Sequence, residues 1–462
     1  MRRAALAALA LLAGCAAGPD YHRPKLDVPD AYRDVVAEPA GASIADAGWW
    51  SVYGDPRLVT LIETALRSNL DLQAAAARID QARAALGEAR LGLLPTIDAH
   101  GTLTRGKSSA DVLLPGSPRI KNSGEAAVTV AYELDLWGRL RRLSEAARAN
   151  LLATEYARRT IAATLVAEVA NAYFTLISLD AQLEITKRTV GTREKFVDLT
   201  RTQHERGYAS GLDVATAEAQ AAVARANVPD VERRIAATED QICLLLGENP
   251  HQIERERRGE AVPEAPPPPP PGLPSELLER RPDVRAAEEA LRAANANVGA
   301  ARAALFPTIS LTGLAGSLSS PLGDLFRSPT AEWSAAAGLV QPLLDPQRSV
   351  YQVEMANARK REVLAQYEQA VRTAFQETAD GLVAYRKYIE LAREQTNQVA
   401  ALRRAEEIAL ARYRVGYASY FDVINADRDL FTAELTLSQG YANSLTGFVR
   451  LYQVLGGGWQ VR

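Results

Sequence analysis

Several residue types are scarce in this chain of 462 residues, and each scarcity argues against a class of protein. There are only two cysteines, Cys15 and Cys243, so a framework of disulfide bonds is not expected. The net charge is -3 with intermixed signs, which provides no basic surface for nucleic acid. The composition, 47% hydrophobic and 24% charged, is instead that of a folded protein with a sizeable core.

Motifs that would carry catalysis are missing as well. The four histidines lie far apart, without the spacing of metal ligands: His22, His100, His204 and His251. The sequence has no phosphate-binding loop and no nucleophile elbow. We therefore expect no catalytic site, no metal and no cofactor.

A long hydrophobic run is absent after the N-terminal region. The most apolar stretch, residues 161–179, contains Glu168 and Asn171. It lacks the roughly 18 uninterrupted apolar residues of a membrane-spanning helix. Any membrane crossing is therefore expected to use β-strands.

The first fifteen residues have the pattern of an export signal. Basic residues at positions 2 and 3 precede the apolar residues 4–13, and small residues then lead to Cys15. The run Leu12, Ala13, Gly14, Cys15 resembles the bacterial lipobox, whose cysteine is acylated and becomes the mature N-terminus. This resemblance implies a covalent lipid on Cys15 that tethers the protein to a membrane. The alternative is a plain secretory signal with an incidental cysteine.

The chain also repeats itself. A glycine-containing motif occurs twice at a constant offset: Gly207, Tyr208, Ala209, Ser210 and Asp213 recur as Gly416, Tyr417, Ala418, Ser419 and Asp422. Earlier in each half, Gly87, Arg90 and Pro95 recur as Gly299, Arg302 and Pro307. Between the halves, the prolines at 263 and 266–271 favour a semi-rigid, extended connector. The sequence thus predicts a tandem duplication.

Both halves are expected to contain the same elements in the same order. The ranges are a helix (71–90 and 283–302), two strands with alternating polarity (95–107 and 127–134; 308–318 and 331–339), a long helix (139–206 and 347–415) and a return helix (212–246 and 421–455). Each long helix would span about 100 Å and needs a partner along its length. We expect the return helix and the first helix to stack end to end as that partner, with a kink at Pro229.

With these features in hand, the chain resembles the TolC-like outer membrane factors, in particular their lipoprotein branch serving multidrug efflux systems of the RND type. The residues that carry the resemblance occur in the family's order: Gly18, Pro19, Asp20, Tyr21 and Pro24; Trp49, Trp50, Asp55 and Leu58; Asp135 to Arg139; and Arg281, Pro282 and Asp283. The resemblance implies a mainly α protein with a small β part. A long α-helical coiled-coil barrel would join a 12-stranded transmembrane β-barrel formed by a homotrimer, with four strands from each chain.

The resemblance also divides the chain into segments. Residues 1–14 would be the lipoprotein signal peptide, and 15–65 the lipidated N-terminal segment and part of an equatorial belt. The first repeat would cover 66–250, the proline-rich linker 251–274, the second repeat 275–456 and the C-terminal tail 457–462.

The function implied by the resemblance is that of a passive exit duct in the outer membrane, anchored by lipid and extending into the periplasm. It would conduct drugs or other small molecules from a periplasmic adaptor and an RND-type inner-membrane transporter to the exterior. The adaptor would dock on the two turns, at Gly207, Tyr208, Ser210, Gly416, Tyr417 and Ser419. The alternative interpretation is that these are helix-hairpin turns, a role we expect for Gly207 and Gly416 themselves, in which Asp213 and Asp422 cap the return helices.

The resemblance also places a gate at the two turns. Asp422 matches an acidic ring at the closed tip of such channels, and Asn425 stands where a second acidic ring would be. Tyr413 and Asp213 match a tyrosine and an aspartate that pair between neighbouring coils. Since Ala418 replaces the arginine of a second link, we expect a weaker latch.

Three alternatives remain open from the sequence: the duct of a type I protein secretion system, a periplasmic coiled-coil adaptor or structural lipoprotein, and an exported enzyme that hydrolyses wall polymers. The strand pair inside each duplicated unit favours the duct over the adaptor. The absent catalytic motifs argue against the enzyme.

Overall fold

A computed structural model of the chain describes residues 17–29, 32, 53–109, 111, 116, 118–256, 259, 262, 265–266, 274–341 and 346–457. The predicted signal peptide, Cys15, most of the linker prolines and the tail from residue 458 lie outside these described residues. Contacts divide the chain into two compact units. We name them the sheet unit (Met1–Lys25, Arg78–Glu155 and Ala286–Glu368) and the coil unit (Leu26–Ala77, Tyr156–Arg285 and Gln369–Arg462).

The elements follow the same order in both halves of the chain. The first half contains α2 (Pro56–Ser68), α3 (Leu70–Leu91), β1 (Thr96–Lys107), β2 (Ile120–Leu134), α4 (Arg139–Glu205) and α5 (Gly211–Leu246). The second half contains α6 (Pro274–Arg280), α7 (Pro282–Ala303), β3 (Thr308–Ser319), β4 (Ala331–Val340), α8 (Pro346–Arg414) and α9 (Tyr420–Val454), with two short 3-10 turns, η4 (Leu322–Asp324) and η5 (Ser328–Thr330), between β3 and β4. The predicted duplication of elements is confirmed.

The predicted helices and strands begin and end within one residue of the observed bounds, with one exception. Strand β2 begins at Ile120 rather than Ala127, because its polar first part pairs with the last residues of β1. The short helices α2 and α6 were not predicted. Each begins with a proline, which the first turn of a helix accepts, and Asp55 caps α2 by accepting hydrogen bonds from the backbone N–H groups of Arg57 and Leu58.

The return helices meet the first helices end to end, as the sequence predicts. In the first half, the Asn69 side chain donates a hydrogen bond to the carbonyl of Leu245, at a distance of 3.0 Å between Nδ2 and O. In the second half, Arg281 Nη1 donates to the carbonyl of Val454 at 3.3 Å. Both bonds satisfy a carbonyl in the last turn of a helix, which has no partner within that helix. The same junction is therefore built twice within the coil unit.

Side-by-side packing of α4 and α5 forms part of the core of the coil unit. Leu179 and Leu183 of α4 pack against Val231 of α5. Helix α5 continues through Pro229 without a break in its helical residues, and the predicted kink remains a prediction. In the described part of the chain, α4 alone is long and apolar enough to cross a membrane by length and composition, but 61% of its most apolar window is buried. We assign this window to the packed core.

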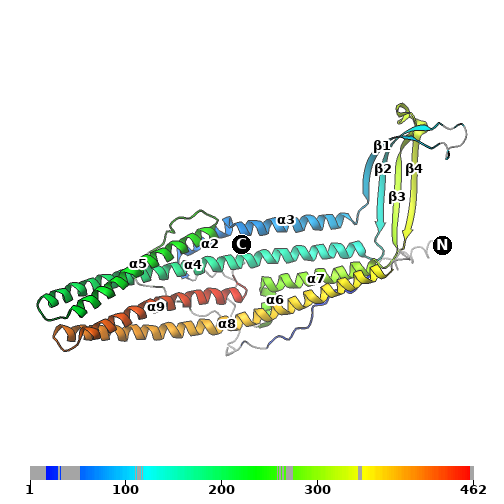
Figure 1. Cartoon of the computed structure of the whole chain (residues 1–462). Coiled ribbons are helices and arrows are strands. Elements are labelled where there is room, and N and C mark those ends of the chain that lie inside the picture. The colour runs from blue at the N-terminus through cyan, green and yellow to red at the C-terminus, as the bar shows by residue number, and fades with distance from the viewer. Residues whose placement is uncertain are drawn as a thin grey trace. The chain divides into compact units, whose positions relative to one another are not determined.

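The four strands form one antiparallel sheet in the order β1-β2-β3-β4 (Figure 1). The sheet therefore joins the strand pairs of both repeats through the contact of β2 with β3. The register pairs Leu103 with Gly124, Val128 with Ala315, and Ala315 with Trp333. Every second residue in such rows lies on the same face.

The register separates an apolar face from a polar face. The apolar face carries Ile97, Ala99, Leu103, Val128, Val130, Tyr132, Leu311, Trp333 and Leu339. The polar face carries Asp98, His100, Thr102, Glu125, Thr129, Glu133, Ser310, Thr312, Glu332 and Ser334. The predicted alternation in each strand is thus combined into two continuous surfaces, and the large side chains of the apolar face are exposed in the single chain.

Crowding distinguishes the two faces. Gly316, which lies on the polar face, approaches β2 so closely that a Cβ on it would be 2.6 Å from the Cβ of Ala127. On the apolar face, a Cβ on Gly313 would meet nothing closer than 3.9 Å. The polar face is therefore the concave side of the sheet at this point.

This difference predicts that Gly316→Val destabilises the sheet by about 1–3 kcal/mol, because the added side chain overpacks the concave face. The matched variant Gly313→Val, three residues earlier in the same strand, should have little effect. The measurement is the midpoint of urea unfolding in detergent, followed by tryptophan fluorescence. Equal midpoints for the two variants would contradict the assignment of the concave face.

Candidate functional site

Two glycine turns close the helical hairpins of the coil unit, and they have the same geometry. Gly207 and Gly416 adopt positive φ angles of 77° and 80°. Immediately afterwards, Ser210 and Ser419 begin the return helices, and each forms a reciprocal capping box with the aspartate three residues later. In each box, the serine side chain accepts from the aspartate N–H and the aspartate side chain accepts from the serine N–H. The alternative of a turn with capping aspartates is thus confirmed as a structural role.

The two turns also expose large apolar and aromatic side chains. Tyr208 is 84% exposed and Tyr417 is 79% exposed. Leu212 and Phe421, in the first turns of α5 and α9, are exposed as well. Four such side chains at the end of two hairpins give this part of the coil unit an apolar surface without a cover in the single chain.

Tyr413, one of the predicted gate residues, has a hydrogen-bond partner that the sequence did not indicate. Its hydroxyl donates a hydrogen bond to Gln203 Oε1 at 2.6 Å, and its ring lies 5.7 Å from that of Tyr420. Asp213, the predicted partner, uses its carboxylate to cap α5. Burial, followed by the nearby charge of Asp213, raises the pKa of Tyr413. Tyr413 therefore links the two hairpins of one chain through Gln203, while Asp213 stays close as a neighbouring charge.

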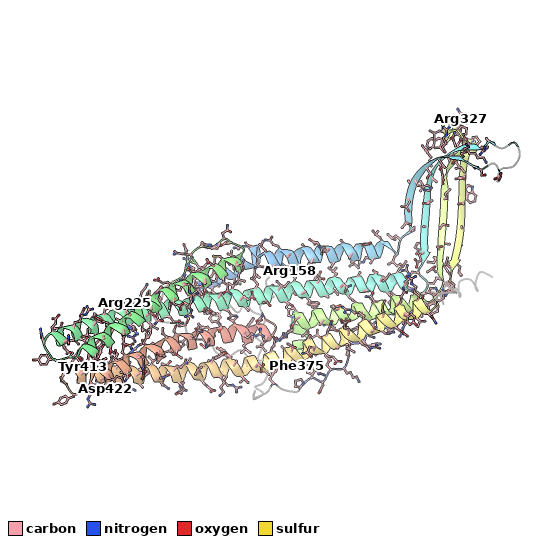
Figure 2. The ribbon with its side chains drawn as sticks, viewed as in Figure 1. Arg158, Arg225, Arg327, Phe375, Tyr413 and Asp422 are labelled. Carbon is pink, nitrogen blue, oxygen red and sulfur yellow. The ribbon has the colours of Figure 1, made fainter. Side chains whose placement is uncertain are left out.

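The other predicted gate residues lie in the second hairpin. Figure 2 shows Tyr413 and Asp422 close to each other at the end of the coil unit. Hydrogen bonds from Ser419 lower the pKa of the exposed Asp422, so this carboxylate is charged at neutral pH. Asn425 lies one turn further along α9 and is partly buried. The role of these residues in closure remains a prediction.

A buried ion pair that sequence reasoning missed joins α4 to α9. Arg193, only 4% exposed, donates from Nε to Asp427 Oδ2 at 2.8 Å and from Nη1 to the carbonyl of Gln220. Its guanidinium also lies over the ring of Phe431. Burial raises the pKa of Asp427, and the arginine opposes that shift. The available signal was the position of Arg193 on the buried seam of α4, four residues before Val197.

A second ion-pair cluster lies near the first and connects three helices. Glu434 of α9 is buried and binds two arginines, Arg188 of α4 and Arg403 of α8. Burial and the nearby charges of Asp427 and Glu434 raise the pKa of Glu406. Together these contacts hold the start of α9 against a helix from each repeat.

Among the residues that the structure describes, no group of three or more histidine, cysteine, aspartate or glutamate side chains is arranged to hold a metal ion. The chemistry available at the two turns is therefore that of hydrogen bonds, fixed charges and exposed aromatic rings.

A sheet with one apolar and one polar face, joined in sequence to long paired helices that end in glycine turns, agrees with the architecture of an outer-membrane channel. The sequence profile described as "outer membrane efflux protein" matches residues 61–248 and 273–457 of the chain. The chain belongs to this family, which is one of efflux ducts and not of enzymes.

Named relatives agree with this assignment. The chain is 37% identical over 457 residues to the toluene efflux pump outer membrane protein TtgC and to the antibiotic efflux pump outer membrane protein ArpC, both of Pseudomonas putida. These matches cover 97% of this chain and 94% of each relative. The solved structure of the outer-membrane channel OprN is similar with a TM-score of 0.90 and 30% identity, over 97% of this chain and 100% of that chain. The predicted family and fold class are confirmed.

The buried ion pair leads to a prediction about the start of α9. Asp427→Ala should destabilise the protein by about 3–5 kcal/mol, because it leaves Arg193 buried without its carboxylate. The control is Asp429→Ala two residues away, whose exposed pair with Arg428 should be worth about 1 kcal/mol or less. Urea unfolding and amide hydrogen exchange in α9 measure both effects. If the two variants lose the same stability, the pair does not hold α9 in place.

Proposed function

We propose that the chain is the exit duct of a tripartite efflux pump and conducts its cargo passively across the outer membrane. The observation that carries this proposal is the division of the sheet into a continuous apolar face and a concave polar face. The apolar face would contact lipid, and the polar face would line a water-filled passage.

Closure of this passage requires more than one chain. The described sheet has two edges, β1 and β4, and each edge strand has backbone groups without a partner strand. In lipid, every unpaired backbone group costs several kcal/mol. A homotrimer in which β4 of one chain pairs with β1 of the next would form a closed barrel of 12 strands and remove all edges.

The two glycine turns would form the periplasmic tip of the duct. The exposed side chains of Tyr208, Leu212, Tyr417 and Phe421 supply an apolar surface on which a periplasmic adaptor could dock. The contact of Tyr413 with Gln203 would hold the two hairpins together and keep the tip narrow. Asp422 would place a negative charge at that constriction, favouring cations over anions.

The names of the relatives support a choice of cargo. TtgC is named for a toluene efflux pump and ArpC for an antibiotic efflux pump. We therefore favour small organic molecules as cargo over secreted proteins. The family resemblance of the sequence implies an RND-type transporter as the inner-membrane partner, and we retain it in the proposal. The inner-membrane transporter would select the cargo, since a passive duct needs no binding site of its own.

A lipid on Cys15 would anchor the chain at the level where the strands meet the helices. Residues Ala17–Lys25, which we name the strap, are held in the sheet unit by several contacts. The N–H of Ala17 donates to the carbonyl of Trp137, in the short connection between β2 and α4, at 2.8 Å. Further along, Arg142 binds Asp20 at 2.7 Å.

The position of the strap limits the position of the lipid. In the sequence, Cys15 is two residues before Ala17, the residue at which the strap contacts the connection between β2 and α4. The acyl chains would therefore enter the membrane near the end of β2 that leads into α4. This placement supports an anchor in the leaflet that faces the periplasm.

The gate can be tested by conductance. Wild-type protein reconstituted into planar bilayers should form ion-conducting channels that are mostly closed. The double variant Tyr413→Phe with Asp422→Asn, which removes the charge but keeps an oxygen that can accept the capping hydrogen bond, should conduct several-fold more. The reason is the loss of the hydrogen bond to Gln203 and of the charge at the tip. The control is Tyr417→Phe with Asp429→Ala, which removes one hydroxyl and one carboxylate outside the proposed gate. Equal conductance of wild type and the gate variant would exclude these residues from closure, and a wild type without conductance would exclude the duct.

The anchor can be tested by labelling. Cells that express the protein and are fed radioactive palmitate should label the wild type and the variant Cys243→Ser, but not Cys15→Ser. Since the chain has only these two cysteines, the pair of variants is a complete test. Label on Cys15→Ser would show that the N-terminal pattern is not a lipidation signal.

A further inference from the structure

On β1 and β2 the unbroken part of the apolar face ends at Leu103 and Gly124, and Ile120 is the one large apolar residue of these strands beyond that point. On β2, the residues of this face run from Leu134 to Gly124, and Gly124 lies opposite Leu103 of β1. These ten steps extend about 33 Å along the strand, or about 25 Å in height at the usual strand tilt. That height equals the apolar band of an outer-membrane barrel. Leu103 therefore marks the end of the band that is farther from the helices.

Two cations follow directly on the same face. Arg105 and Lys107 are two and four residues beyond Leu103, so the alternation of the strand keeps both side chains on the apolar face. Arg105 lies about 5 Å and Lys107 about 10 Å above the band. Both are exposed. They are at the same end of the sheet as Arg327, which is labelled in Figure 2.

The neighbours of these cations do not neutralise them. Across the strand, Arg105 faces Asn122 and Lys107 faces Ile120. Within the described residues, neither cation forms an ion pair. Two like charges about 7 Å apart on one face repel each other unless an anion lies beside them. Their aliphatic stems can lie along the apolar band while the charged ends reach upward.

We propose that Arg105 and Lys107 form a binding site for the phosphate groups of a phosphorylated glycolipid in the outer leaflet. This inference rests on the proposed function, because it uses the apolar face as the lipid-facing side and the helices as the periplasmic side. The cations lie at the height where such a lipid carries its phosphates, just above its acyl chains. A trimer would present three of these pairs around the rim of the barrel.

The choice of an outer-leaflet lipid follows from position as well as charge. A lipid of the opposite leaflet would place its headgroup at the other end of the band, near Leu134 and the start of α4. Phosphate and guanidinium form charge-assisted hydrogen bonds, and several lipid phosphates side by side match two cations on one strand.

The test compares two double variants of the full-length trimer. Arg105→Gln with Lys107→Gln removes the proposed site. Arg119→Gln with Lys121→Gln removes the same charge from the neighbouring end of β2, where Lys121 lies opposite Gly106 on the polar face. Native mass spectrometry counts the bound lipid, and a titration followed by thermal melting gives the affinity. The probes are bisphosphorylated lipid A, dephosphorylated lipid A and phosphatidylglycerol.

Wild type and the control variant should bind bisphosphorylated lipid A, and the site variant should bind it about 30-fold more weakly. Dephosphorylated lipid A and phosphatidylglycerol should bind wild type no better than they bind the site variant. Retained affinity in the site variant, or equal affinity of wild type for all three lipids, would overturn the proposal.

Conductance of the same preparations separates this inference from the proposed function. Both double variants should conduct like wild type, since neither changes the tip. A wild type that binds bisphosphorylated lipid A through Arg105 and Lys107 but conducts no ions would retain the lipid site and refute the duct.

Discussion

A helix of 67 residues is stable only if a partner covers its apolar seam, and this requirement governs the architecture of each repeat. The return helix α5 has 36 residues and cannot cover α4 alone. The end-to-end junction at Asn69 and Leu245 provides the continuation, because it brings a further helix to the point where α5 ends. The second repeat solves the same problem with Arg281 and Val454.

The sequence predicted the elements well because proline and glycine mark their ends. The long helices contain no proline beyond Pro346, the first residue of α8, and both glycine turns are followed by a serine and an aspartate that form a capping box. The alternation of apolar and polar residues also predicted the strands. The alternation did not predict the first part of β2, residues 120–126. This polar run becomes a strand only because it pairs with β1. Pairing between distant segments cannot be read from local alternation.

The candidate site was predicted less completely for a related reason. The turns and the aspartates could be located from the repeated motif, but the contact of Tyr413 with Gln203 depends on how two hairpins pack and was not predicted. The pair Arg193 and Asp427 is separated by more than two hundred residues, so its burial was not visible before the fold. The one local indication of this ion pair was that Arg193 is a charged residue on the buried seam of α4.

The capping box of α9 limits which amino-acid substitutions this part of the protein can accept during evolution. Asp422 accepts the hydrogen bond that starts the helix, and by proposal it also sets the charge of the constriction. A substitution that removed the charge together with the cap would fray the very turn that shapes the opening. Natural variation in ion preference should therefore accumulate at neighbouring positions without a capping duty, such as Asn425, while the serine and the aspartate of the turn remain tied to folding.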